Sequence, residues 1–217
     1  MDLYRRLPVA DEAEIIHAAI PEGSDILELG CGAGRVTHPL IELGHQVTAV
    51  DQSEEMLASV QGAERIHADI ETIRLNRRFA AVVLGSHLVN DPDDMRRLAY
   101  LATCRHHVEP QGAVIIERYA PDLNWRDREG VPSLLGSVVS TPRDVRIDGT
   151  HLQAVMEYTV GSRIWTQAFE AVLLDDDVMQ HELSRAGLLL NQWLDAGRKW
   201  LRAGPRSDQL AAGVLPA

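Results

Sequence analysis

Short apolar runs alternate with amphipathic segments along the first half of the chain. The apolar runs, which are bounded by glycines and polar residues and are therefore expected to be strands, are 25–29, 46–50, 64–69, 79–85 and 112–119. The segments whose apolar positions have helical spacing, and which therefore predict helices, are 10–20, 34–44, 53–61 and 91–108. This alternation indicates an α/β fold, with a doubly wound, mainly parallel sheet covered by helices on both faces.

The pattern changes in the second half of the chain. Residues 141–174 contain β-rich runs separated by Asp148-Gly149 and Gly161-Ser162, which are typical of hairpin turns. In the middle run, 151–160, alternate positions from Leu152 onward share one face of the expected strand. We predict an antiparallel β insertion that extends or caps the parallel sheet.

The length of 217 residues suits a single domain. Its expected parts are an N-terminal helix and lid at 1–20, a ligand-binding core at 21–120, the antiparallel insertion at 141–174 and a flexible tail at 204–217. Between the insertion and the tail, 175–188 predicts a helix and 188–196 a last strand. Residues 122–141 are ambiguous between helix and loop.

Charge and composition restrict the possible partners. The formal net charge of -11, from 21 Lys and Arg against 32 Asp and Glu, argues against nucleic acid, because phosphate groups favour a basic surface. No apolar run approaches the roughly 18 residues needed to cross a bilayer, and no charged-then-apolar leader opens the chain. Cys31 and Cys104 fit no paired zinc spacing. We expect a cytoplasmic monomer or homodimer with no membrane partner.

Glycines and acids mark the ends of the expected strands. Gly30, Gly32 and Gly34 directly follow the first strand, where glycine lets a ligand approach the free backbone N–H groups of a sharp turn. Asp51 ends the second strand, where an acid can accept hydrogen bonds from both ribose hydroxyls of an adenosine group. Asp69 ends the third strand and is placed to contact adenine.

Residues 20–120 resemble class I S-adenosylmethionine-dependent methyltransferases. The stretches that carry this resemblance are ELGCGAG, VTAVDQS, HADIE, FAAVVLGSHLV and VEPQGAVIIER. The first four are similar to the successive motifs of the family, and the last is similar to the segment that leads into the fifth strand. The resemblance implies a Rossmann-like seven-stranded sheet and S-adenosyl-L-methionine as the cofactor.

The resemblance also implies which residues bind the cofactor. The glycine loop, with Cys31 inside it, approaches the methionine part, and Glu28 organises the loop and the cofactor's amino group. The residues that would contact the adenosine part are Asp51, Gln52, Met56, Asp69 and Ile70. Gly85, Ser86 and His87 fall where the reactive methyl group faces the acceptor.

His87 is the candidate catalytic base, because imidazole titrates in the useful range. The candidate substrate-binding residues are Tyr4 in the lid, Arg118 and Tyr119 at the end of the fifth strand, and His151 and Trp165 in the insertion. Adjacent residues of a strand point to opposite faces, so Glu117 and Arg118 cannot both face the site unless the strand has ended.

Departures from related families restrict the reaction further. The segment GSHLVN contains neither the Asn/Asp-Pro-Pro-aromatic motif of nucleic-acid amino-methyltransferases nor the double-glutamate loop of protein-arginine enzymes. Asp91, Asp93 and Asp94 lie beside Pro92 at a helix start, so we interpret them as a capping cluster and not as metal ligands. We predict metal-independent transfer of a methyl group to N or O of a small-molecule acceptor, by in-line displacement, as in tailoring enzymes of secondary metabolism.

Two other functions stay open from the sequence. A non-catalytic partner subunit that binds S-adenosylmethionine would carry the same glycine loop. A nicotinamide-dependent oxidoreductase fits less well, because position 35 is Arg where the dinucleotide motif has a later glycine, and no Tyr-x-x-x-Lys pair is present.

Overall fold

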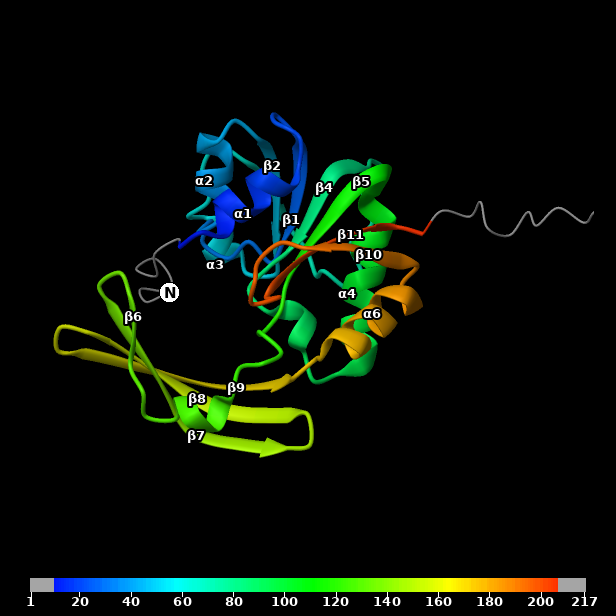
Figure 1. Ribbon diagram of the computed structural model, residues 1–217. Helices are drawn as coiled ribbons and strands as arrows, with labels where there is room; N and C mark the ends of the chain where they lie inside the picture. Colours follow the sequence, from blue (N-terminus) through cyan, green and yellow to red (C-terminus); the bar gives the residue numbers. More distant parts are fainter. Residues whose placement is uncertain (1–9, 207–217) are drawn as a thin grey trace, which may run out of the picture.

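The computed structural model describes residues 10–206, which form two β-sheets with helices packed around the larger one (Figure 1). In spatial order, the seven strands of the larger sheet are β10 (Leu188–Trp193), β11 (Trp200–Pro205), β5 (Val108–Glu117), β4 (Phe79–Leu84), β1 (Asp25–Leu29), β2 (Gln46–Asp51) and β3 (Glu64–His67). Strands β1 to β5 run parallel, and β11 lies antiparallel between β5 and β10. The predicted Rossmann-like, mainly parallel seven-stranded sheet is confirmed.

Helices cover both faces of the larger sheet. On one face, α1 (Glu12–Ala19) and α2 (Thr37–Glu42) pack against Ile26 and its same-face neighbours. On the other face, α4 (Asp94–His107) and α6 (Asp176–Arg185) pack against Leu27 and its same-face neighbours. Ile26 and Leu27 are adjacent in β1 and both fully buried, which is what a parallel strand between two helical layers requires.

The short helices lie at the ends of strands. They are α3 (Glu54–Leu57), the 3₁₀ turn η2 (Leu88–Asn90) and α5 (Trp125–Arg128). Ser53 caps α3 as expected, since its hydroxyl accepts a hydrogen bond from the backbone of Met56 at 3.2 Å. Asp93 caps α4 by accepting from the backbone of Met95 and Arg96, so this member of the acidic cluster does cap the helix. None of the helices in the described part of the chain has the length and apolar character needed to cross a membrane.

The C-terminal boundary differs from the prediction. Gly204 and Pro205 were expected in a flexible tail, but they belong to β11, which pairs with both β5 and β10. The local sequence of β11 has little apolar alternation, and its strand form depends on the two neighbours that it finds in the sheet. The rest of the expected tail, from residue 207, lies outside the described residues.

The insertion forms a separate four-stranded antiparallel sheet, so of the two predicted arrangements it does not extend the parallel sheet. Its strands, in spatial order, are β6 (Ser133–Leu135), β7 (Val138–Asp148), β8 (His151–Val160) and β9 (Arg163–Val172). The sheet therefore begins before residue 141. It cannot extend the larger sheet at β5, because β11 already pairs with that edge. Figure 1 shows it beyond the carboxyl ends of the parallel strands.

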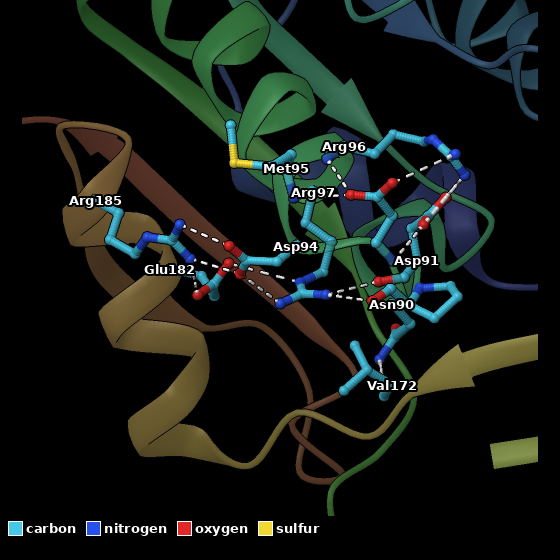
Figure 2. Close-up of polar contacts among 11 residues, drawn as sticks. Asn90, Asp91, Asp94, Met95, Arg96, Arg97, Val172, Glu182 and Arg185 are labelled. Atoms are coloured by element: carbon cyan, nitrogen blue, oxygen red, sulfur yellow. Dashed lines mark hydrogen bonds and ion pairs between the residues drawn. The ribbon is translucent and has the colours of Figure 1, made fainter. Parts of the chain in front are cut away.

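Asn90, at the end of η2, connects the two sheets. Its side-chain amide donates a 2.8 Å hydrogen bond to the carbonyl of Val172 at the end of β9 (Figure 2). Its oxygen accepts a hydrogen bond of 3.0 Å from the backbone N–H of Tyr119. Asn90 is 1% exposed, so both of its bonds are shielded from water. The segment after β4 therefore positions the second sheet.

An ion-pair network joins α4 to α6 beside this connection (Figure 2). The guanidinium of Arg185 binds both carboxylate oxygens of Asp94, at 2.7 and 2.8 Å, and also reaches Glu182 at 2.8 Å. Arg97 donates to the carbonyl of Asp91 and to the Asp94 carboxylate, each at 2.9 Å. The network thus ties the helix that follows the second sheet to the helix that follows the candidate site.

Arg118 is a structural residue, which corrects its expected role in binding substrate. Its side chain is fully buried, donates to the carbonyls of Leu174 and Arg198, pairs with Asp176 and lies over the ring of Trp193 at 4.4 Å. These partners come from three separate segments of the chain. The buried contacts of Arg118 thus hold these segments together just after the end of β5.

We expect Arg118→Met to lower the free energy of unfolding by about 3 kcal/mol, because the buried hydrogen bonds and the ion pair are lost together. The matched control is Arg143→Met, which removes a half-exposed pair with Glu157 and should cost about 1 kcal/mol or less. Urea unfolding of the two variants measures the difference. Equal losses would contradict the structural role of Arg118.

Candidate active site

The glycine loop after β1 has the left-handed geometry that its sequence predicts. Gly30, Gly32 and Gly34 have φ values of +75°, +56° and +87°, which residues other than glycine rarely adopt. A Cβ atom on Gly30 would also lie 2.6 Å from Cδ1 of Leu88. The loop therefore needs glycine for its backbone conformation and for the space above it.

Asp51, at the end of β2, holds this loop in place. One carboxylate oxygen accepts a 2.8 Å hydrogen bond from the backbone of Gly32, and the other accepts one of 2.8 Å from the backbone of Ser53. Each oxygen keeps a lone pair, because a carboxylate offers about four acceptor sites. Asp51 can therefore shape the loop and accept ribose hydroxyls at the same time.

A cavity of about 160 Å³ opens beside Asp51. Its lining residues are Gly30, Asp51, Gln52, Asp69, Ile70, Glu71, Leu88 and Tyr100. The structure thus brings together most of the residues expected at the adenosine. Sequence reasoning missed Glu71, Leu88 and Tyr100; Glu71 and Leu88 directly follow predicted residues, whereas Tyr100 reaches the cavity from α4 without a local signal.

Ile70 and Leu88 give this cavity apolar walls, and the acids and Gln52 give it hydrogen-bond acceptors and donors. That combination fits an adenosine group, whose base is flat and whose ribose carries two hydroxyls. Among the described residues, no group of three or more His, Cys, Asp or Glu side chains could hold a metal ion.

Other expected cofactor residues lie close by with different surroundings. Cys31 is buried and packs against Ala49, Leu57 and Val60, and burial raises the pKa of its thiol, so its side chain supports the loop from within the core. Met56 is half-buried on α3 and does not line the described cavity.

Glu28 is buried beneath the loop, where its carboxylate accepts a hydrogen bond of 2.5 Å from the hydroxyl of Thr37. Burial raises the pKa of Glu28 to about 7, and the bond from Thr37 offsets only part of this rise. Glu28 thus joins β1 to α2 across the glycine loop, in agreement with an organising role.

A strained turn follows β4. Ser86 and His87 have φ values of +54° and +58°, which are uncommon outside glycine. The turn is held by Glu117, at the end of β5, whose carboxylate accepts a 2.7 Å hydrogen bond from the backbone N–H of Ser86. Glu117 is 3% exposed and pairs through its other oxygen with Nζ of Lys199 at 2.7 Å.

The His87 ring lies against this carboxylate and against Tyr119. Nδ1 of His87 is 3.6 Å from Oε1 of Glu117, and the His87 and Tyr119 ring centroids are 4.1 Å apart. Burial lowers the pKa of His87 to about 4; Glu117 acts in the opposite direction, and Lys199 adds to the lowering. His87 is therefore a neutral imidazole at neutral pH.

One face of the second sheet, which we call the aromatic face, lies beside this turn. Tyr119 packs against Trp125 and Phe169, with ring centroids 5.1 and 6.3 Å away. Strand register puts the following side chains on that face together with Phe169: Leu152, Ala154, Met156, Tyr158, Trp165 and Gln167. Half of the chain's ten Trp, Tyr and Phe residues thus gather here, namely Tyr119, Trp125, Tyr158, Trp165 and Phe169.

The other residues that were expected to bind substrate do not all lie at the aromatic face. Tyr119 and Trp165 belong to the aromatic face and its surroundings. His151 does not, because it is exposed and alternates with the buried Leu152, which turns it to the opposite face. Tyr4 lies outside the described residues.

Known proteins that are similar to this chain include methyltransferases. The model of a family described as "Methyltransferase domain" matches residues 26–112. A dTDP-3-amino-3,4,6-trideoxy-alpha-D-glucopyranose N,N-dimethyltransferase from Streptomyces venezuelae is 31% identical, over 94% of this chain and 89% of its own length. A ubiquinone biosynthesis O-methyltransferase from Bradyrhizobium diazoefficiens is 30% identical over 116 residues, which is 48% of this chain and 42% of that protein.

The fold also matches a solved structure of an S-adenosylmethionine-bound amino pentose methyltransferase from Micromonospora echinaspora. The TM-score is 0.73 at 21% identity, and the match covers 95% of each chain. The chain belongs to the class I S-adenosylmethionine-dependent methyltransferases, and it is an enzyme that uses this cofactor. This membership sets aside a nicotinamide-dependent oxidoreductase.

We expect Asp51→Asn to weaken binding of S-adenosylmethionine and S-adenosylhomocysteine by at least about 10-fold, because one charge-assisted acceptor is lost and the loop loosens. Glu22→Gln, which changes an exposed carboxylate before β1, is the matched control and should bind both ligands like the wild type. Calorimetric titration measures both. Unchanged affinity of Asp51→Asn would exclude Asp51 from the cofactor site.

The raised pKa of Glu28 predicts that the stability of the protein depends on pH. Its pKa is raised from 4.5 to about 7 in the folded state, so its contribution to stability is fully present below pH 4.5 and is lost as pH rises through 7. The free energy of unfolding of the wild type, relative to Glu28→Gln, should therefore fall between these pH values. Urea unfolding over that range measures the difference, and a flat difference would contradict the raised pKa.

Proposed function

We propose that this enzyme methylates the amino group of a small molecule, and that its acceptor is an amino sugar of secondary metabolism. The observation that carries the proposal is the extent of the amino-sugar relative's match, which includes the second sheet, whereas the ubiquinone O-methyltransferase matches only 48% of this chain. Acceptor recognition is expected in the second sheet, because it faces the turn after β4.

The aromatic face supports a small, partly apolar acceptor. Sugars and nucleotide bases present flat apolar faces, which stack on aromatic side chains. Tyr158 and Trp165 are directly opposite each other on β8 and β9 and are half-buried, so their rings are available at the edge of the cluster. Tyr119 then lies between this cluster and His87.

When bound, the cofactor supplies a methyl group activated by its own positively charged sulfur. The residues of this chain mainly have to align the amine with that group, and alignment can contribute on the order of 7–11 kcal/mol. The neutral imidazole of His87 accepts a hydrogen bond from the amine, which directs the nitrogen lone pair. Its low pKa suits an orienting role better than storage of a proton, so the proton that the amine loses on methylation would pass to solvent.

Metal ions take no part in this proposal, because the amine needs alignment and the sulfonium is already activated. The test of function is turnover by the purified chain alone. It is incubated with S-adenosylmethionine and a panel of acceptors: the dTDP-linked 3-amino sugar, the same sugar without the nucleotide, and a phenolic O-methyl acceptor. Mass spectrometry should show methylation of an amino sugar and none of the phenol. No turnover of either amino sugar with cofactor binding intact would exclude these sugars as acceptors.

We expect His87→Gln to lower kcat by about 100-fold, because without the orienting hydrogen bond the amine is misplaced, and a misplacement of about 1 Å can cost about that much. The dissociation constant for S-adenosylmethionine should stay within about 3-fold, because His87 does not line the cofactor cavity. His106→Gln, which changes an exposed histidine on α4, serves as the control and should keep full activity. Equal kcat for both variants would exclude the role of His87.

A further inference from the structure

Lys199, in the turn between β10 and β11, reaches the candidate active site from a part of the chain with no recognisable motif. Its ammonium is 2.7 Å from Oε1 of Glu117, and the Lys199 side chain is 38% exposed. The same Glu117 oxygen is the one that lies 3.6 Å from Nδ1 of His87. Lys199 and His87 thus face one carboxylate oxygen.

A buried carboxylate next to an imidazole normally favours the protonated ring. Here the carboxylate is already engaged, since one oxygen holds Ser86 N–H at 2.7 Å and the other holds Lys199. Nδ1 of His87 is buried and makes no hydrogen bond among the described residues. The contact between His87 and Glu117 that would stabilise an imidazolium is therefore long. The Glu117 carboxylate also pairs with Lys199, at a shorter distance.

We propose that Lys199 is a positioning residue of the methyltransferase site, which binds Glu117 and so keeps the proton off His87. The inference rests on the proposed function, in which neutral His87 accepts an N–H from the amine. An imidazolium has no acceptor lone pair, and it would repel the positive sulfur of the cofactor. The Lys199 ammonium thus keeps the neighbouring His87 ring neutral.

Other charged and titratable groups around His87 do not replace Lys199. Arg35, in the glycine loop, acts in the same direction, but it pairs with Glu12 of α1 at 2.5 Å, whose charge opposes its effect on His87. The Tyr119 hydroxyl has a pKa raised by burial and stays neutral. Burial has the largest effect on the pKa of His87, and among the charged groups Glu117 and Lys199 have the largest effects.

The test is an NMR titration of His87 in the intact protein, with ¹³C-labelled histidine and His87→Gln to assign the signal. In the wild type, the His87 signal should not titrate between about pH 5.5 and 8. In Lys199→Met, and in Lys199→Gln as a second neutral variant, it should titrate within this range, which requires the pKa of His87 to rise from about 4 by at least about 1.5. Lys199→Arg keeps the charge and should behave like the wild type.

The double variant Lys199→Met with Glu117→Gln completes the design, because it removes the anion together with the cation and keeps an acceptor for Ser86 N–H. His87 should again fail to titrate. A His87 signal that is unchanged in both neutral Lys199 variants, or that already titrates near pH 6.5 in the wild type, would overturn the proposal. The titration needs no acceptor, so failure of the proposed function would appear separately, as absent turnover.

Discussion

Carboxylates at the ends of parallel strands hold the backbone of the turns beside them, and the site depends on this arrangement. The loop after β1 and the turn after β4 both use left-handed backbone conformations, which leave N–H groups without helix or sheet partners. Asp51 satisfies the N–H of Gly32, and Glu117 satisfies that of Ser86, each from a different strand. Each of these acids therefore shapes the turn beside the candidate site.

One side chain also makes two structural contacts where the two sheets meet. Asn90 binds the end of β9 and the backbone of Tyr119 through one buried amide. Tyr119 in turn contacts the His87 ring and the aromatic cluster of the second sheet. A change in the turn after β4 is thus transmitted to the surface where the acceptor is proposed to bind. Arg118, on the reverse side of β5, fixes the chain that leaves the second sheet.

Two buried carboxylates, those of Glu12 and Glu117, each pair with a cation. Burial pushes the pKa of Glu12 upward, but its ion pair with Arg35 and its backbone hydrogen bonds outweigh that effect and lower the pKa. This pair attaches α1 to the glycine loop. Glu117 and Lys199 form the corresponding pair at the methyl side, and there the consequence falls on a third group, His87. A cation thus satisfies the buried carboxylates of Glu12 and Glu117, and at Glu117 it also acts on the charge of His87.

The sequence by itself determined the order of strands and helices, the glycine loop, and the acids of the cofactor cavity, because these depend on local patterns and on the chain order of one parallel sheet. Tertiary structure decided which neighbour faces the site: Glu117 and not Arg118, Trp165 and not His151. Alternation along a strand places adjacent residues on opposite faces, but it does not say which of the two faces lies toward the site. Lys199 reaches Glu117 only because β11 pairs with β5, a contact between segments about 80 residues apart that no local pattern encodes.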